Sequence, residues 1–268
     1  MKKIINISIW VLFIVGVLVL LSFSQSSKNK TVSKEVSITI NTEDGNHFMT
    51  NKRVNTILTN MGYSFGSNTM SQLDTRKIEN KLLGLSCVKS VIVHKNLNGK
   101  VAIKIEQRKP IARIFNGNGT SIYIDENGKI MPVSEYYTSR VLVVNGYFNL
   151  KSNQSIAELN ENDSLKNSSL LDEIFALASH INKNDFLKAQ IEQIYIEKNK
   201  EITLIPKVGN QKIIFGKLNN NLSNSKEIEE KMDKLILFYT KGINPENLNL
   251  YRTINLTYNN QIICKKIQ

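Results

Sequence analysis

Residues 91–105, VIVHKNLNGKVAIKI, decide the fold of the first half of the chain. Apolar and polar residues alternate in both halves of this stretch, as they do in strands with one buried face. The apolar positions are Val91 and Val93 in the first half and Val101, Ile103 and Ile105 in the second. Asn98-Gly99 separates the halves and is the dipeptide that best tolerates the positive φ angles of a tight turn. The stretch therefore predicts a β-hairpin.

The residues before this hairpin predict one strand and two helices. Alternation over residues 36–40 indicates a half-buried strand. Thr50 can cap a helix with apolar residues at i, i+3, i+4 and i+7, which Gly62 would end. Asp74 can cap a second helix, which Gly84 would end. The order β-α-α-β-β predicts a compact unit with both helices on one face of a three-stranded sheet.

From Pro110 onward the pattern changes to short strands separated by turns, with two helices among them. The helices are predicted to begin at Ser169 and near Ser225, the second ending at Gly242. The predicted strands are 111–115, 121–125, 129–131, 141–144, 191–197, 201–206, 212–215, 253–258 and 261–265. The fold class is therefore α+β, with a first domain at 35–108 and a mostly β domain with two or more helices at 109–268.

Residues 4–23 carry no charge and are long enough to cross a bilayer as one helix. We expect a cytoplasmic tail at 1–3, a single transmembrane helix at 4–23 and a polar linker at 24–34. The domains would then lie outside the cytoplasm. A cleaved signal peptide, with an apolar core at 9–21 and small residues at Ser22 and Ser24, stays open as the alternative. The length of the uncharged run favours an anchor.

The charge of the chain gives no sign of a nucleic-acid partner. Lys and Arg number 35 against 23 Asp and Glu, a net charge of +12. Five of the lysines and no acid fall in the first 34 residues, which leaves +7 for residues 35–268. A nucleic-acid binder usually concentrates such a surplus in a basic stripe. The sequence has only short pairs such as Arg108-Lys109 and Lys265-Lys266.

Residues that could perform chemistry are few and scattered. The three histidines and two cysteines show no metal-ligand spacing, so we expect no metal and no cofactor. The acidic pairs Glu43-Asp44 and Asp125-Glu126 lie in turn contexts. Cys87 and His94 are seven residues apart, an odd spacing that places them on opposite faces of a strand, and a buried cysteine is the better interpretation. We therefore expect that the protein is not an enzyme and that it has no catalytic residue and no small-molecule substrate.

Four stretches together resemble the FtsQ/DivIB family of bacterial cell-division proteins. They are 97–112 (LNGKVAIKIEQRKPIA), 123–128 (YIDENG), 140–146 (RVLVVNG), and 254–258 (INLTY) followed by 261–264 (QIIC). The resemblance covers nearly the whole chain and implies a cytoplasmic tail, one span, a POTRA domain and a β domain. Residues 255–258, NLTY, depart from the Asp-Leu-Arg-Tyr form that is common in proteobacterial members of the family and lack both of its charges.

The resemblance implies a non-enzymatic scaffold of the divisome in the cytoplasmic (inner) membrane at the division septum. It would bind the ectodomains of FtsB and FtsL and help control the septal peptidoglycan synthase. The partner-binding residues would lie on the last strands: Asn255, Leu256, Tyr258, Ile262, Ile263 and Cys264. A strand at a sheet edge offers unpaired N–H and C=O groups that a partner strand can complete. An internal hairpin with capped edges is the alternative for these strands, which the residues alone leave equally open.

Two other classes of protein compete with this interpretation. A POTRA-type subunit for envelope assembly or secretion would need several POTRA units or a long run of amphipathic barrel strands. A membrane-anchored periplasmic hydrolase would need a nucleophile–base pair or a metal cluster. The sequence offers neither pattern.

Overall fold

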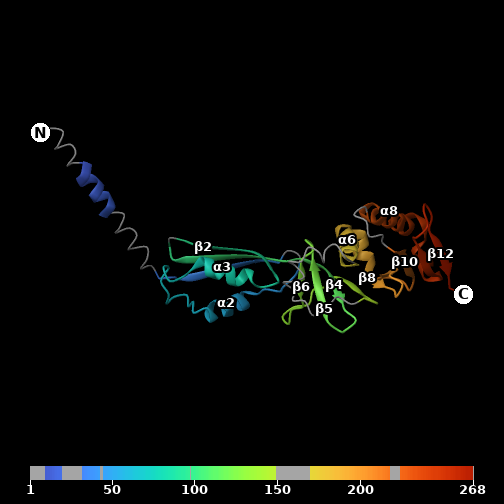
Figure 1. Cartoon of the computed structure of the whole chain (residues 1–268), viewed down its shortest axis with the longest axis horizontal. Helices are drawn as coiled ribbons and strands as arrows, with labels where there is room; N and C mark the ends of the chain where they lie inside the picture. Colours follow the sequence, from blue (N-terminus) through green and yellow to red (C-terminus); the bar gives the residue numbers. More distant parts are fainter. Residues whose placement is uncertain are drawn as a thin grey trace. The chain divides into compact units, whose positions relative to one another are not determined.

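The computed structural model describes residues 10–19, 32–42, 45–96, 98–148, 170–217 and 224–267. These residues fall into two compact units, Met1–Gln107 and Arg108–Gln268 (Figure 1). We call them the first unit and the second unit and describe each by itself.

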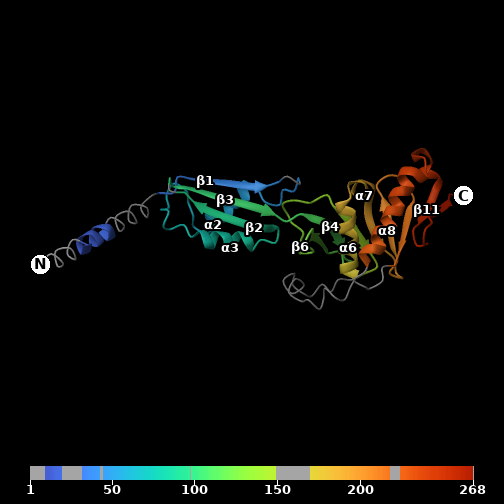
Figure 2. The same cartoon turned by 90° about the horizontal axis from the view of Figure 1, so that it is seen from above.

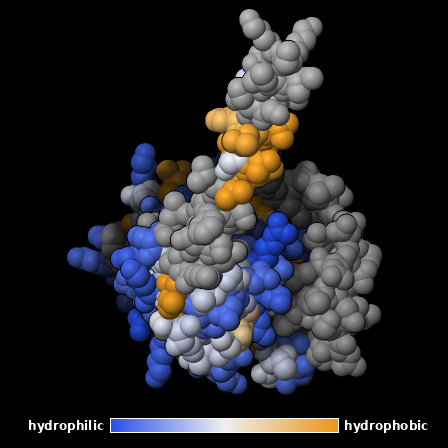
Figure 3. Space-filling model, turned by 90° about the vertical axis from the view of Figure 1, so that its left-hand side faces the viewer, coloured by the Kyte–Doolittle hydropathy of each residue, from blue (hydrophilic) through white to orange (hydrophobic). Residues whose placement is uncertain are grey.

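Residues 10–19 form a helix whose large apolar side chains are all exposed, from 39% at Val17 to 78% at Leu12. These side chains make most of the orange surface in Figure 3. Within the part of the chain that the structure describes, no helix is long and apolar enough to cross a membrane. The other residues of the predicted span at 4–23, the tail at 1–3 and residues 24–31 of the linker lie outside the described residues.

The first unit has the predicted β-α-α-β-β order. Its elements are β1 (Glu35–Asn41), α2 (Asn51–Asn60), α3 (Thr75–Leu83), β2 (Val88–Lys95) and β3 (Lys100–Gln107). The sheet order is β1-β3-β2, with β1 parallel and β2 antiparallel to the central strand β3 (Figure 2). The first strand is therefore a neighbour of the last one, and both β1 and β2 lie at edges.

Local hydrogen bonds and apolar packing hold this unit together. The side chain of Thr50 accepts a bond from Arg53 N at 3.2 Å, and that of Asp74 accepts one from Lys77 N at 3.1 Å, so both predicted helix caps are confirmed. Val101, Ile103 and Ile105 are buried on the helix side of β3, while Lys104 between them is exposed. The other core residues include Val54, Leu58, Ile78, Leu82, Val91 and Val93. One face of the sheet is therefore covered by the helices and the other is open.

The second unit contains one nine-stranded sheet with the order β12-β11-β10-β9-β8-β7-β4-β5-β6. The strands are β4 (Pro110–Phe115), β5 (Ser121–Asp125), β6 (Ile130–Pro132), β7 (Leu142–Gly146), β8 (Ile191–Ile196), β9 (Ile202–Pro206), β10 (Lys212–Gly216), β11 (Tyr251–Asn255) and β12 (Ile263–Lys266). Three of the neighbouring pairs, β4 with β7, β7 with β8 and β10 with β11, are parallel. The predicted α+β class is confirmed.

Helices α6 (Leu170–Lys183), α7 (Asp185–Gln190) and α8 (Asn224–Leu237) belong to this unit, and Figure 1 shows α6 and α8 on the same side of the strands. The last predicted helix does reach Gly242, but its final turn is the π-helix η1 (Phe238–Gly242). α7 and the 3₁₀-helix η2 (Pro245–Leu250) were not predicted, because six residues are too few for a helical period to show. Aliphatic side chains of the strands and helices form one core between the two layers.

Asp125 has a structural role in the second unit. Its Oδ1 accepts bonds from Asn127 N at 2.9 Å and Lys129 N at 2.7 Å, which close the turn between β5 and β6. Its Oδ2 accepts a bond at 3.0 Å from Arg108, and the Asp125 side chain is fully buried. The turn context that the sequence indicated is confirmed, and the buried ion pair with Arg108 is an addition. Glu43-Asp44, the other acidic pair, lies outside the described residues.

Candidate functional site

Reactive side chains are dispersed in the part of the chain that the structure describes. No three His, Cys, Asp or Glu side chains among the described residues come together in a way that could hold a metal ion. Cys87 is buried and Cys264 half-buried, and neither of them forms a disulfide. Cys87 lies 3.9 Å from Nη1 of Arg53.

The strand β12 forms one edge of the nine-stranded sheet and pairs only with β11. The N–H of Leu256 donates to Ile214 O of β10 at 2.9 Å, so the alternate residues Thr253 and Asn255 direct their backbone groups to β12. In this antiparallel pair Thr253 lies opposite Lys265, and Asn255 lies opposite Ile263. The bond from Ile267 N to Leu250 O, at 2.9 Å, continues this alternation. The N–H and C=O groups of Cys264 and Lys266 therefore point away from the sheet.

The structure does not place the predicted residue Leu256 on an exposed strand. β11 ends at Asn255, and the Leu256 side chain is fully buried. The reason is alternation: Ile254 and Leu256 both point to the side of the sheet that the helices cover, where apolar groups pack. Leu256 is therefore part of the core of the second unit.

The other five predicted residues surround the edge, with different exposures. Tyr258 and Ile263 are each 45% exposed. Ile262 and Cys264 are half-buried against the core, and the same burial raises the pKa of the Cys264 thiol. Asn255 uses its Oδ1 to accept bonds from the N–H of Thr257 at 2.9 Å and its hydroxyl at 2.7 Å. The predicted strand at 261–265 is shifted, because β12 begins at Ile263.

A hollow of about 400 Å³ lies beside this edge, where α8 and η1 meet the turn before β12. Its lining residues are Lys234, Leu237, Phe238, Lys241, Gly242, Asn260, Gln261 and Ile262. Leu237 is 55% exposed in this hollow. We call the outer edge of β12, this hollow and Tyr258 the C-terminal site.

Lys234 connects the helix to the chain end. Its Nζ donates to Leu256 O at 3.2 Å and to Tyr258 O at 2.8 Å. Burial lowers the pKa of this lysine, and the neighbouring charge of Lys231 lowers it further. These bonds fix the turn that carries Tyr258 against the end of α8.

Sequence reasoning missed Lys234, Leu237, Phe238 and Lys241 as parts of the site. A signal for one of them was available, because Leu237 falls outside the apolar stripe of its helix and is therefore expected to point to solvent. The lysines gave no signal, since charged residues on an exposed helix face are ordinary.

The opposite edge of the same sheet is less suited to pairing. β6 is only three residues long and ends at Pro132, which has no N–H to donate. Shortness and proline are two features that protect a sheet edge from pairing with another chain. Of the two edges, β12 is therefore the one that can accept a further strand.

Comparison with known families gives two matches. The model described as FtsQ/DivIB, C-terminal related, matches residues 109–265, and a POTRA-like domain model matches residues 31–106. The first match covers more than half of the chain. No curated protein matches the chain.

Proposed function

The chain belongs to the FtsQ/DivIB family, and from this premise we propose that it is a non-enzymatic scaffold of the divisome. In this proposal it binds FtsB-like and FtsL-like ectodomains outside the cytoplasm, links early and late division proteins, and helps control septal peptidoglycan synthesis. The family is one of division proteins without catalytic activity, which supports the general role in cell division. The identities of the partners are part of the proposal.

The outward backbone groups of β12 are the observation that carries the proposal. Cys264 and Lys266 each present an N–H and a C=O beyond the last strand of the sheet. An extended partner segment can pair with these groups, so that backbone bonds supply affinity and side-chain pockets supply specificity. The structure thus favours the docking edge over the capped hairpin that the sequence left open.

The hollow beside β12 suits an apolar side chain from the same partner. Leu237 and Ile262 offer apolar surface there, and Lys234 and Lys241 stand among the lining residues. Lys265 and Lys266 follow on the edge strand itself. A partner segment with apolar residues next to carboxylates would match this combination. Tyr258, which is half-exposed, would serve as the aromatic anchor that interfaces often contain.

We also propose that residues 4–23 anchor the protein in the cytoplasmic membrane, with the N-terminus inside the cell. The helix at residues 10–19 and its exposed apolar side chains support this proposal. A phosphatase fused after Lys34 is expected to be active in cells. Release of a shortened soluble protein from the membrane would instead establish a cleaved signal peptide.

The test of the C-terminal site is a binding measurement with purified FtsB and FtsL ectodomains and the full-length chain. Tyr258→Ala is expected to weaken binding by about 2 kcal/mol, close to thirtyfold, since truncation of a central aromatic anchor typically costs that much. Its stability is expected to change little because the ring is half-exposed. Tyr136→Ala is the matched control, since Tyr136 is 69% exposed elsewhere in the same unit.

Cys264→Pro tests the edge itself. Proline removes the N–H that points outward, whereas the bonds from β12 to β11 come from Ile263 and Lys265 and remain. We expect the variant to lose partner binding while the second unit still unfolds cooperatively. If Cys264→Pro and Tyr258→Ala both bind the ectodomains as tightly as the parent, the partner docks elsewhere and the C-terminal site is not the interface.

A further inference from the structure

The sheet of the first unit also has two edges, and one of them is blocked by a side chain. The N–H of Asn96 donates to Lys100 O at 2.8 Å across the hairpin, so alternation directs the backbone groups of Val91 and Val93 away from β3. The carboxylate of Glu79 on α3 accepts a bond from Val93 N at 2.8 Å. A partner strand on β2 would have to displace this carboxylate. Such a charged cover is a way of protecting an edge from further pairing.

The edge at β1 has no corresponding cover among the described residues. The N–H of Lys34 donates to Gly99 O at 2.8 Å, where the parallel pair begins. The N–H and C=O of Ser33 point away from β3 and bond to Asn68 O and Gly66 N. Lys100 O faces β2, since it accepts from Asn96 N, so the backbone groups of Val101, Ile103 and Ile105 face β1 by alternation. Val36, Ile38 and Ile40 lie directly opposite these residues in the parallel register, and their own N–H and C=O groups therefore point outward. The open part of the edge therefore begins where the contacts of Ser33 end.

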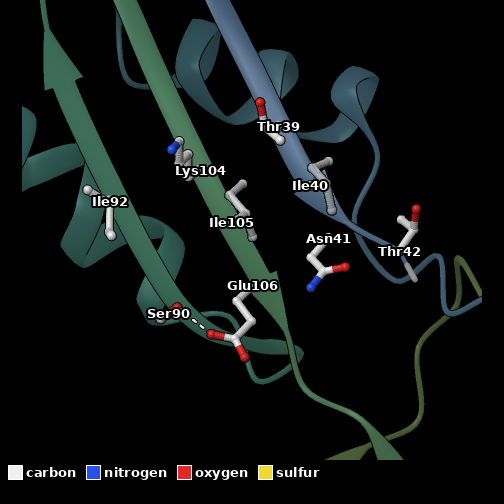
Figure 4. A pocket seen from close by; sticks show the side chains of 9 residues that line it. All are labelled: Thr39, Ile40, Asn41, Thr42, Ser90, Ile92, Lys104, Ile105 and Glu106. Carbon is white, nitrogen blue, oxygen red and sulfur yellow. Dashed lines mark hydrogen bonds between the residues drawn. The ribbon is translucent and has the colours of Figure 1, made fainter. Parts of the chain in front are cut away.

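The side chains along β1 also leave room for a neighbour. Val36, Ile38 and Ile40 point to the helix side but are only half-buried, because no strand lies beyond them. On the uncovered face, a hollow of about 490 Å³ lies over the three strands, and Figure 4 shows the side chains that line it. Its lining residues are Thr39, Ile40, Asn41, Thr42, Ser90, Ile92, Lys104, Ile105 and Glu106. Ile92 is 47% exposed there.

The charges beside the hollow are paired, with one exception. Glu35 bonds to Lys100 at 3.0 Å, and Glu106 bonds to Lys89 and to the hydroxyl of Ser90, each at 3.0 Å. Lys104 of β3 is exposed and lies directly opposite Thr39 of β1. Among the described residues, no carboxylate lies within ion-pair distance of the Lys104 ammonium group. Figure 4 shows its side chain on the open face between β1 and β2. The surface next to the β1 edge therefore holds an unmatched positive charge.

We propose that the outer edge of β1 is a second docking site, which takes an extended segment of another protein with alternating apolar and acidic residues. Its backbone would bond to the outward groups of Val36, Ile38 and Ile40, and its apolar side chains would cover the side chains of the same three residues. Its carboxylates would lie on the uncovered face near Lys104. The site belongs to the first unit and does not depend on the C-terminal site.

A second copy of the chain fits this edge less well than a different protein. β1 itself has the sequence EVSITIN, and its one carboxylate is Glu35, which already bonds to Lys100. Two β1 strands paired side by side would therefore bring no free carboxylate to Lys104. The charge of the surface selects an acidic partner instead.

The experiment uses the full-length chain in detergent micelles and a synthetic peptide with the sequence Thr-Val-Glu-Val-Thr-Val-Glu, blocked at both ends. Amide hydrogen exchange is followed residue by residue. At a peptide concentration that gives about 90% occupancy, exchange at Ile38 and Ile40 is expected to slow about tenfold, while Val93 is unchanged. A peptide with lysine in place of glutamate is the charge-matched control and is expected to bind more weakly.

Three variants give the proposal its sharpest test. Ile38→Pro removes an outward N–H without removing a bond to β3 and is expected to abolish the protection at Ile40. Lys104→Glu, which leaves the backbone unchanged, is expected to weaken binding of the acidic peptide about fivefold and to favour the lysine peptide. Glu79→Ala uncovers the β2 edge and is expected to add protection at Val91 and Val93. If Ile38→Pro does not fold, the reversed peptide preference of Lys104→Glu decides the question.

Other outcomes would overturn the proposal. These are no protection at Ile38 and Ile40, equal protection at Val93 in the parent, or binding that is unchanged in Lys104→Glu. Protection that appears without peptide and grows with protein concentration would mean that a second copy occupies the edge. Tyr258→Ala is expected to bind the peptide normally, which separates this site from the C-terminal site.

Discussion

Gln107 and Arg108 are neighbours in the chain, but each fixes a different unit through buried polar contacts. The amide of Gln107 is 3% exposed, accepts a bond from Met49 N at 2.7 Å, and donates to Asn41 O at 2.9 Å and Asn46 O at 3.0 Å. Arg108 instead bonds to the buried carboxylate of Asp125. The first unit thus relies on a neutral side chain where the second uses an ion pair.

This difference determines how much stability each unit loses when one partner of the contact is removed. A neutral group that loses its partner costs the desolvation of that group, typically about 1–3 kcal/mol. A buried charge that loses its partner costs more, about 3–5 kcal/mol, because it cannot be solvated. The two units should therefore respond unequally to the loss of one polar side chain.

The largest effect is expected for Asp125→Ala. The variant leaves Arg108 without its carboxylate and removes the acceptor of Asn127 N and Lys129 N. Since Arg108 is 23% exposed and can reach water, we expect a loss of about 3 kcal/mol in the free energy of unfolding of the second unit. Chemical denaturation followed by hydrogen exchange in each unit measures it. An equal loss of stability in the two units would contradict the assignment of this ion pair to the second unit.

Asp125→Asn separates the charge from the turn. The amide oxygen can still accept from Asn127 N and Lys129 N. The free energy of unfolding of the second unit is therefore expected to fall less in this variant than in Asp125→Ala. Partner binding should fall only as far as the folded fraction falls. Loss of binding in a fully folded Asp125→Asn would mean that this side chain acts on the partner directly.

A smaller effect, about 1–3 kcal/mol, is expected for Gln107→Leu, and only in the first unit. The leucine would bury a similar volume but leave the N–H of Met49 without its acceptor. Gln193→Leu is the control, because Gln193 is half-buried and donates to one side chain, Asn145. We expect that control to change stability by less than about 0.5 kcal/mol. Identical stability of Gln107→Leu and the parent would show that the three bonds contribute nothing.

The smallest effect concerns alkaline pH and the second unit. Burial raises the pKa of the Tyr239 phenol above its usual 10.0, against bonds from Gln211 and Gln190 that lower it. The folded state therefore holds this proton to higher pH than the unfolded state does. The resulting stability is complete below the unfolded pKa and is lost as pH rises through the folded pKa.

Unfolding curves between about pH 9 and pH 12 test this dependence. Tyr239→Phe is expected to flatten it in part, since the Cys264 thiol also has a raised pKa and contributes with the same sign. The same decline in Tyr239→Phe as in the parent would show that the phenol does not titrate with unfolding.

Several features could be read from the sequence because they depend on residues close together in the chain. The caps Thr50 and Asp74 each bond to a backbone N–H three residues on. The turn at Asp125 closes within four residues. The alternation at residues 91–105 records which side chains face the core, and this pattern is kept whatever the neighbouring strand is. Local hydrogen bonds and periodicity therefore fixed the elements and their order.

The tertiary structure alone decided which strands lie at edges and which of those edges are open. β1 joins β3 and β10 joins β11 as parallel pairs across long intervals, so no local pattern marks their neighbours. The bond from Val93 N to Glu79 that covers β2 joins residues 14 apart on different elements. Leu256 has the strand-like character of an exposed contact, yet α8 and β10 bury it. An edge exists only once a sheet has been assembled, and for that reason its position could not be read from the residues that form it.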